Sequence, residues 1–172
     1  MRKIVTLIKH YKLVRIILNS FLGNNGYFNQ IGWTNSYNTR LPVSQKGEAL
    51  PWVTYPFIDF ISERLNNNMQ IFEFGSGNST IFYAGRVKSV HSVEHDLEWV
   101  VQLKKMLPEN AKVFHQELIY GGEYCKFPST LDRKFDIVIV DGRDRVNCMI
   151  NAMSYITENG VIILDDSDRK SV

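Results

Sequence analysis

The chain reads Ile71-Phe72-Glu73-Phe74-Gly75-Ser76-Gly77-Asn78-Ser79-Thr80, a short apolar run that carries one acid and opens into a Gly-Ser-Gly turn. Glycine has no Cβ, so such a turn can adopt positive φ and let a ligand approach the main chain. Glu94 ends the next apolar run, nineteen residues after Gly75. That separation is typical of an acid that accepts hydrogen bonds from ribose hydroxyls. Together the two features predict a site for a nucleotide-like cofactor.

Apolar runs that read as β-strands recur from residue 71 onward, and helical patterns separate most of them. The predicted strands are Ile71–Phe74, Lys88–Glu94, Lys112–His115, Phe135–Val140 and Val161–Leu164, and the predicted helices between them are Thr80–Ala84, Leu97–Leu107 and Val146–Ile156. The last two strands are nearly continuous in β-branched residues, which suits parallel strands covered on both faces. The alternation predicts an α/β fold with a doubly wound, mostly parallel sheet.

The composition is that of an ordinary globular protein. The 172 residues suffice for one domain with a sizeable core, and the net charge of +2 gives no argument for a nucleic-acid partner. The two cysteines, Cys125 and Cys148, match no metal or redox spacing. We therefore expect a cytoplasmic protein with reduced thiols.

The distribution of apolar and polar residues divides the chain into two parts. Residues 1–50 are predicted to form an amphipathic helix and a connector, and residues 51–172 are predicted to form the cofactor-binding domain. Apolar residues follow helical spacing within 1–22, but interspersed Lys and Arg make a membrane span improbable. Two interpretations of this helix stay open: it packs on the domain, or it rests on an anionic membrane surface as a peripheral contact. Asn24–Gly47 is predicted to be an irregular connector because it is rich in Asn, Gly and Ser.

Polar residues follow every predicted strand. In chain order they are Gly75-Ser76-Gly77-Asn78-Ser79, Glu94-His95-Asp96, Gln116-Glu117, Asp141-Gly142-Arg143 and Asp165-Asp166-Ser167. Ligands of open α/β sheets bind outside the carboxyl ends of the strands, so we expect these residues to surround one site. Helix capping is the alternative for several of them, and Asn78 or Ser79 also suits the N-cap of the following helix.

Two classes of cofactor compete for the turn. Dinucleotide binding favours a third glycine three residues after Gly77, where this chain has Thr80, and the acid Glu73 would sit awkwardly beside a pyrophosphate. A cationic sulfonium ligand removes that difficulty, because Glu73 then stabilises positive charge. No Gly-Lys-Ser/Thr follows the glycines, so a P-loop is excluded. An NAD-binding oxidoreductase or epimerase remains the alternative.

The segment Glu73–Gly77, the acid Glu94 and the strand-end Asp141 and Asp165 resemble class I S-adenosylmethionine-dependent methyltransferases over about residues 51–169. The resemblance implies a Rossmann-like fold with strand order 3-2-1-4-5 and O-methylation of a small-molecule or sugar hydroxyl. It also implies a set of contacts with S-adenosylmethionine. In that set, the methionine end is held by Glu73, Gly75, Ser76 and Gly77, and the ribose diol is bound by Glu94. The adenine is flanked by His95, Asp96, Gln116 and Glu117. The remaining contacts are made by Asn78, Ser79 and Asp141.

Asp141 and His95 are the candidate general bases. A further resemblance, to catechol-type O-methyltransferases, implies a Mg²⁺ site formed by Asp141 with Asp165 and Asp166. Magnesium favours oxygen ligands and would lower the pKa of an acceptor hydroxyl. The alternatives are an N-cap role for Asp165 or Asp166 and a ribose contact for Asp141.

Members of the resembled family continue beyond the fifth strand, whereas this sequence ends at Val172. We therefore expect a C-terminally incomplete domain, and a fragment that binds cofactor without turnover is a further alternative. A fifth strand with a bare apolar edge also predicts self-association into a homo-oligomer.

Overall fold

The computed structural model describes residues 11–14, 16–17, 19–21 and 26–167. The chain forms two units, residues 1–52 and residues 53–172. The predicted amphipathic helix within 1–22 lies largely outside the described residues; residues 11–14, 16–17 and 19–21 are helical. Among the described residues, none of the helices combines the length and the apolar character needed to cross a bilayer.

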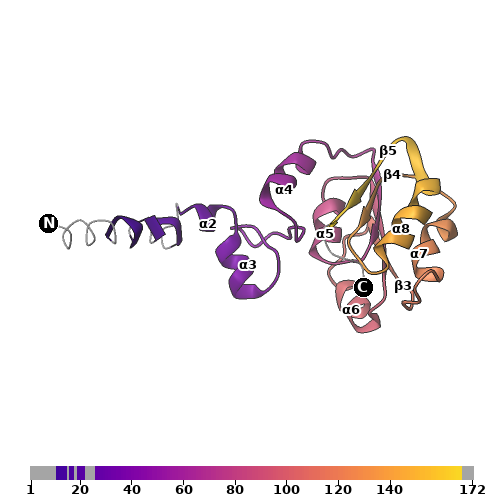
Figure 1. Cartoon of the computed structure of the whole chain (residues 1–172), viewed down its shortest axis with the longest axis horizontal. Coiled ribbons are helices and arrows are strands. Elements are labelled where there is room, and N and C mark those ends of the chain that lie inside the picture. The colour runs from indigo at the N-terminus through magenta and orange to yellow at the C-terminus, as the bar shows by residue number, and fades with distance from the viewer. Residues whose placement is uncertain (1–10, 15, 18, 22–25, 168–172) are drawn as a thin grey trace. The chain divides into compact units, whose positions relative to one another are not determined.

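The larger unit is built on a five-stranded sheet (Figure 1). Its strands are β1 (Gln70–Phe74), β2 (Ser89–Glu94), β3 (Ala111–His115), β4 (Phe135–Val140) and β5 (Ile156–Leu164). All of the pairings are parallel, and the strands lie in the order β3-β2-β1-β4-β5. The predicted α/β class and strand order are confirmed.

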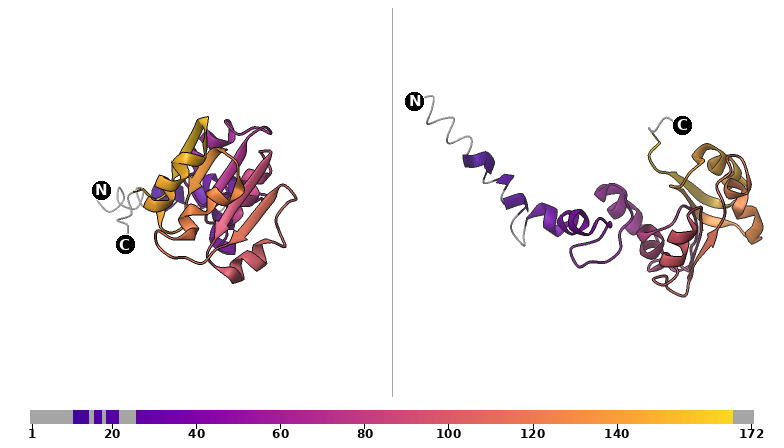
Figure 2. Two further views of the ribbon diagram at one scale, coloured as in Figure 1. Left: turned by 90° about the vertical axis from the view of Figure 1, so that its right-hand side faces the viewer. Right: turned by 90° about the horizontal axis from the view of Figure 1, so that it is seen from below.

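Helices cover both faces of the sheet (Figures 1 and 2). On one face, α5 (Asn78–Ala84) and α6 (Leu97–Leu103) pack over β2 and β3. On the other, α7 (Glu123–Lys126) and α8 (Arg145–Ala152) enclose a core that includes both cysteines, which are buried and free. The residues of β1 from Ile71 to Phe74 are at most 1% exposed. Coverage of both faces explains why the strands read as continuous apolar runs.

Several boundaries differ from the predicted ones. Helix α6 ends at Leu103 rather than Leu107, and α8 ends at Ala152 and continues as the 3₁₀ helix η2 (Met153–Tyr155). Strand β5 begins five residues earlier than predicted, and its register against β4 shifts between Phe135 and Ile137. A second 3₁₀ helix, η1 (Phe127–Leu131), follows α7, and α4 (Tyr55–Ser62) precedes the sheet. The crossover between β3 and β4 contains only the short helices α7 and η1.

The prediction of an irregular connector over Asn24–Gly47 was wrong. This segment contains α2 (Tyr27–Gln30) and α3 (Trp33–Thr39), joined at Gly32 with φ +84°. A Cβ at Gly32 would lie 2.3 Å from the carbonyl oxygen of Val43, so only glycine fits there. Aromatic stacking takes the place of the aliphatic residues that the pattern lacked: the Phe28 ring lies 4.3 Å from that of Phe21.

Candidate functional site

The turn after β1 touches the loop after β4. Gly75 has φ +95°, and a Cβ added to it would lie 3.3 Å from the Cα and N atoms of Gly142. The amide of Gly75 donates to the carbonyl of Val93 on β2, and the amide of Asp141 donates to that of Phe74. Strands β2 and β4 flank β1 on its two sides, which makes this point the place where the strand order reverses. Open α/β sheets bind their ligands there.

Gly142 is constrained from its other side by Tyr124 of α7. A Cβ on Gly142 would lie 2.2 Å from the Tyr124 hydroxyl oxygen. Tyr124 is completely buried, and desolvation raises the pKa of its hydroxyl. This contact was not predictable from the sequence, because Tyr124 lies in the β3–β4 crossover, where no motif marks it. The Tyr124 hydroxyl therefore leaves no room for a side chain at position 142.

Glu73 lies beneath the turn with 1% exposure. Its carboxylate accepts hydrogen bonds from the Ser79 hydroxyl and, at 2.6 Å, from the Thr80 hydroxyl. The Thr80 oxygen in turn accepts from the amide of Gly77 at 3.0 Å. Burial raises the pKa of Glu73 to about 7, although the two hydroxyls act to lower it. The acid therefore supports the turn from below.

The capping prediction for α5 was wrong. The helix begins at Asn78, and its N-cap is Gly77 rather than Asn78 or Ser79. The reason is that the Ser79 hydroxyl donates to Glu73 instead of accepting from the helix backbone.

Glu94 is held at the end of β2 by donors of several kinds. Its Oε1 accepts from the amides of His95 at 2.8 Å and Asp96 at 3.0 Å, and the Nδ1 atom of His95 lies 2.6 Å from the same oxygen. The other oxygen, Oε2, accepts from the Ser76 hydroxyl at 3.3 Å. Ser76 belongs to the glycine turn, so the structure brings the two predicted cofactor elements into direct contact.

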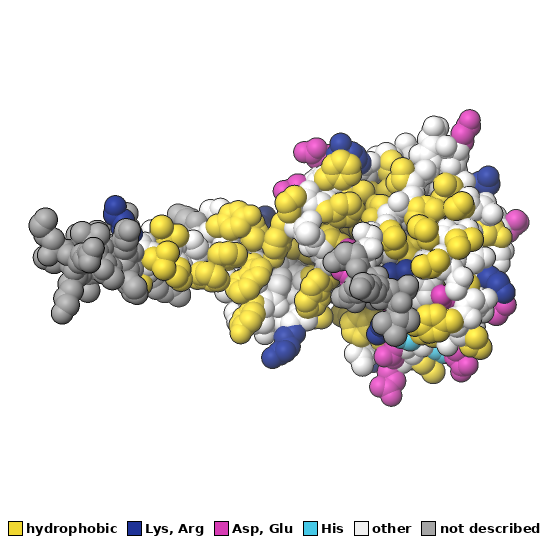
Figure 3. All heavy atoms as spheres, in the orientation of Figure 1, with side chains coloured by type: hydrophobic (Ala, Val, Ile, Leu, Met, Phe, Trp, Pro, Cys, Tyr) yellow, Lys and Arg dark blue, Asp and Glu magenta, His cyan; other side chains and the backbone are white. Residues whose placement is uncertain are grey.

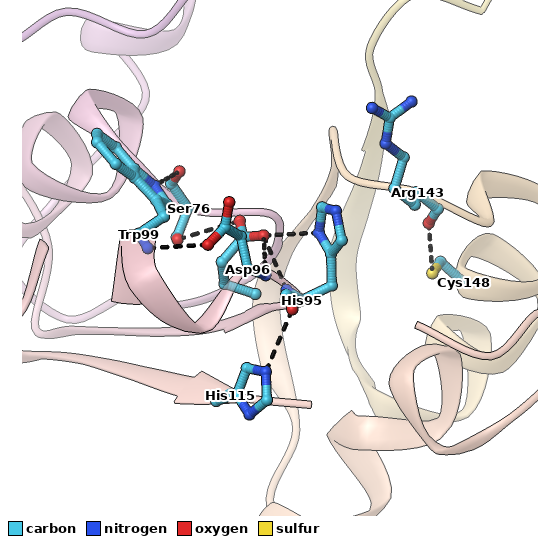
Figure 4. A network of polar contacts seen from close by, with 8 residues as sticks. Ser76, His95, Asp96, Trp99, His115, Arg143 and Cys148 are labelled. Atoms are coloured by element: carbon cyan, nitrogen blue, oxygen red, sulfur yellow. Dashed lines mark hydrogen bonds and ion pairs between the residues drawn. The ribbon is translucent and has the colours of Figure 1, made fainter. Parts of the chain in front are cut away.

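Asp96 and Trp99 complete this network (Figure 4). Asp96 is the N-cap of α6, and its carboxylate accepts from the amide of Trp99 at 3.0 Å. The indole of Trp99 donates to the carbonyl of Ser76 at 2.9 Å. Sequence reasoning missed Trp99. Its only signal was its place three residues after a capping acid, and nothing in the sequence showed that it reaches the turn.

The residues predicted to flank an adenine lie around the ends of β2 and β3. The amide of Gln116 donates to the carbonyl of Glu94 at 3.0 Å, and Nε2 of His115 lies 3.2 Å from the carbonyl of His95 (Figure 4). Glu117 is exposed. Gln116 thus lies beside Glu94, and adenine contacts by these side chains stay a prediction.

The ends of β4 and β5 form a second cluster, made of acids and one arginine. Nη2 of Arg145 lies 3.4 Å from a carboxylate oxygen of Asp141 and 3.5 Å from one of Asp166. Nη1 of the same guanidinium donates to the carbonyl of Asp165 at 2.9 Å. Burial, together with the facing carboxyl of Asp165, raises the pKa of Asp141 above its ordinary value, and Arg145 opposes the rise.

The predicted magnesium site is not supported. Asp141, Asp165 and Asp166 do come to one end of the sheet, but no group of three acidic, histidine or cysteine residues in the described part of the chain is arranged to hold a metal ion. The guanidinium of Arg145 supplies the positive charge between Asp141 and Asp166 instead. The sequence grouped Asp141 with Asp165 and Asp166, but it did not identify Arg145 as the cation among them.

The sequence matches no protein-family model and no curated protein. Solved structures share its architecture. A methyltransferase-like protein from Silicibacter pomeroyi is 24% identical, over 71% of this chain and 76% of its own, with a TM-score of 0.56. The chain has the fold of the class I methyltransferases. Precorrin 8W decarboxylase from Methanobacterium thermoautotrophicum is 14% identical, with a TM-score of 0.52 over 67% of this chain. This chain spans 64% of that protein's length.

Proposed function

We propose that this chain binds S-adenosylmethionine at the carboxyl ends of β1, β2 and β4 and transfers its methyl group to a hydroxyl of a small molecule or sugar. The observation that carries the proposal is the contact between the glycine turn and Glu94 through Ser76, at 3.3 Å. A turn that exposes backbone and an acid suited to a ribose diol are thereby parts of one structure.

The residues present fit such a cofactor. Gly75 and Gly142 keep side chains out of the point where their two loops meet, since a Cβ on either would crowd the other loop. Oε2 of Glu94 accepts only from the Ser76 hydroxyl among the hydrogen bonds described, so a ribose hydroxyl could replace that donor. When bound, S-adenosylmethionine supplies an electrophilic methyl group on a sulfonium.

Most of the catalytic contribution of the chain would be positioning, because methyl transfer is an in-line displacement. Asp141 is the better of the two predicted general bases. Its raised pKa suits a group that takes a proton from an acceptor hydroxyl near neutral pH. Nδ1 of His95 lies 2.6 Å from Glu94, the acid proposed to bind the ribose, which places this imidazole on the β2 side of the site. We therefore propose that Asp141 receives the proton and that His95 helps to hold Glu94.

The dinucleotide alternative is weaker. Thr80 stands where a third glycine would allow close helix–strand packing. Its hydroxyl already occupies the amide of Gly77, one of the donors that a pyrophosphate would use. Glu73 would add a buried acid beneath that phosphate.

Calorimetric titration of the full chain with S-adenosylmethionine, S-adenosylhomocysteine and NAD tests the binding proposal. We expect the first two to bind, and Glu94→Gln to weaken them by roughly 10- to 100-fold, because hydrogen bonds to a charged group contribute about 1.5–3 kcal/mol. Glu109→Gln is the matched control, since Glu109 is an exposed acid ahead of β3. Binding of NAD alone would overturn the proposal.

Turnover is tested separately on a panel of hydroxyl acceptors. We expect Asp141→Asn to lower kcat by roughly 100-fold and to change the Kd for S-adenosylmethionine far less than that, the effect of losing a general base. An unchanged kcat would rule out that role for Asp141.

A further inference from the structure

The two units of the chain carry opposite charge. Residues 1–52 contain seven Lys and Arg and a single acid, whereas residues 53–172 contain thirteen Lys and Arg and seventeen acids. The small overall net charge of +2 hides this division. A basic segment of this kind is attracted to anionic surfaces.

The same basic unit exposes large apolar side chains. On its first helical residues, Tyr11, Leu13 and Ile16 are 69%, 59% and 62% exposed. With 3.6 residues per turn, Val14 and Ile17, which are 47% and 49% exposed, lie on the side of this helix away from Lys12 and Asn19. The described part of the helix is therefore amphipathic, with its apolar side uncovered.

Aromatic residues continue this apolar surface through α2 and α3 (Figure 3). The rings of Trp33 and Tyr37 are stacked with centroids 5.4 Å apart, yet Tyr37 is 72% exposed. Tyr27 and Trp52 are also mostly exposed. Stacking orders Tyr37 without burying it. Trp and Tyr are the residues enriched at the boundary between lipid and water.

We infer that residues 11–52 bind the surface of a bilayer that contains anionic phospholipids. Apolar and aromatic side chains would enter the headgroup region, while Lys12, Arg40 and Lys46, all exposed, would face lipid phosphates. A second copy of the chain is a poor occupant, because two such units would bring fourteen positive charges together against two acids. This inference does not depend on the proposed methyl transfer.

Co-sedimentation of the full chain with vesicles tests the inference. We expect binding to mixed phosphatidylcholine–phosphatidylglycerol vesicles, little binding to phosphatidylcholine alone, and release at high salt because the lipid charges are screened. Equal binding to both vesicles, or binding to neither, would overturn it. The methyltransferase proposal would be unaffected, since its readout is calorimetric cofactor binding.

Two sets of variants locate the surface. Val14→Asn with Ile17→Asn should lower partitioning roughly tenfold or more, because apolar side chains are then no longer buried in lipid. The matched control is Val101→Asn with Met106→Asn, two side chains of the other unit that are each 52% exposed. Lys12→Gln and Lys46→Gln should each lower partitioning about fivefold, which corresponds to about 1 kcal/mol per basic residue.

Circular dichroism of each variant separates loss of binding from loss of folding, and the lysine variants keep the test valid if the apolar pair unfolds. Unchanged binding in both sets would overturn the inference, as would an equal loss in the control pair. A dimer that forms without vesicles and is lost in Val14→Asn with Ile17→Asn would assign the surface to a second copy instead.

Discussion

Two corners of the same sheet edge hold their carboxylates by different means. In the turn corner, formed by Glu73, Gly75–Gly77 and Glu94, the acids accept hydrogen bonds mainly from hydroxyls and backbone amides. In the acid corner, formed by Asp141, Asp165, Asp166 and Arg145, carboxyls face one another and a guanidinium balances them. The turn corner therefore depends on geometry, and the acid corner depends on charge. Variants should separate these two dependences.

The variant with the largest expected effect is Glu73→Gln. It tests whether the uncharged donors around Glu73 can keep this acid ionised. Its pKa is raised from 4.5 to about 7, so the folded state binds the proton more tightly than the unfolded state. The stability contributed by the protonated acid is fully present below pH 4.5 and is lost as pH rises to about 7. Over that window, the free energy of unfolding should fall by about 3 kcal/mol relative to Glu73→Gln, at 1.36 kcal/mol per pKa unit.

Urea unfolding of the wild type and of Glu73→Gln across that pH range makes the measurement. Glu109→Gln, at an exposed position, is the control and should run parallel to the wild type. Parallel curves for Glu73→Gln as well would mean that the hydroxyls of Ser79 and Thr80 offset the burial.

Gly75→Ala tests geometry alone. Alanine at φ +95° is strained, and its Cβ would press on Gly142 at 3.3 Å, so we expect a loss of about 2 kcal/mol in the free energy of unfolding. Gly85→Ala is the matched control, because Gly85 has φ −68° and ordinary contacts. Similar stabilities for the two variants, measured by urea unfolding, would show that the turn corner tolerates a side chain.

Arg145→Met tests the acid corner. Removing the guanidinium takes one positive charge away from between Asp141 and Asp166, and we expect a loss of about 2 kcal/mol above pH 7. The loss should shrink in acid, where the carboxyls are protonated and no longer need a cation. Adding Asp166→Asn should restore part of the stability, because asparagine tolerates the left-handed conformation that Asp166 adopts with φ +47°. An equal loss at both ends of the pH range would mean that Arg145 acts through packing.

The smallest expected effect concerns Ser76. Its hydroxyl bond to Glu94 is long, at 3.3 Å, so Ser76→Ala should change the free energy of unfolding by less than about 1 kcal/mol. The Kd for S-adenosylmethionine should stay within about twofold if the hydroxyl only occupies the place of a ribose donor. A loss as large as that of Glu94→Gln, measured by the same titration, would contradict this view.

The sheet was predictable from the sequence because its signals are local. The β-branched run Phe135–Val140 can hardly be anything but a buried strand, and the resemblance carried by Glu73–Gly77 implied the strand order that is observed. The helices α2 and α3 were missed because they pack by aromatic stacking around Gly32 rather than by a regular apolar face.

The candidate site was predictable only in outline. Strand ends converge in any parallel sheet, so the meeting of the glycine turn with Glu94 followed from the pattern. The residues that fix its shape do not follow from it. Trp99 reaches Ser76 across 23 positions of sequence, and Arg145 reaches Asp165 across 20. Such contacts depend on how far a side chain extends in three dimensions, which spacing along the chain does not encode.

The hydrogen bond between the Trp99 indole and the Ser76 carbonyl makes this residue a natural optical probe. The chain has three tryptophans, and the other two, Trp33 and Trp52, both belong to residues 1–52. In a protein with Trp33→Phe and Trp52→Phe, Trp99 would be the one remaining tryptophan, and its emission would report on the turn that it contacts. Emission from the indole responds to its hydrogen bonding and to nearby charge. Ligand binding could therefore be detected by changes in emission wavelength and intensity, without a labelled cofactor or a known acceptor.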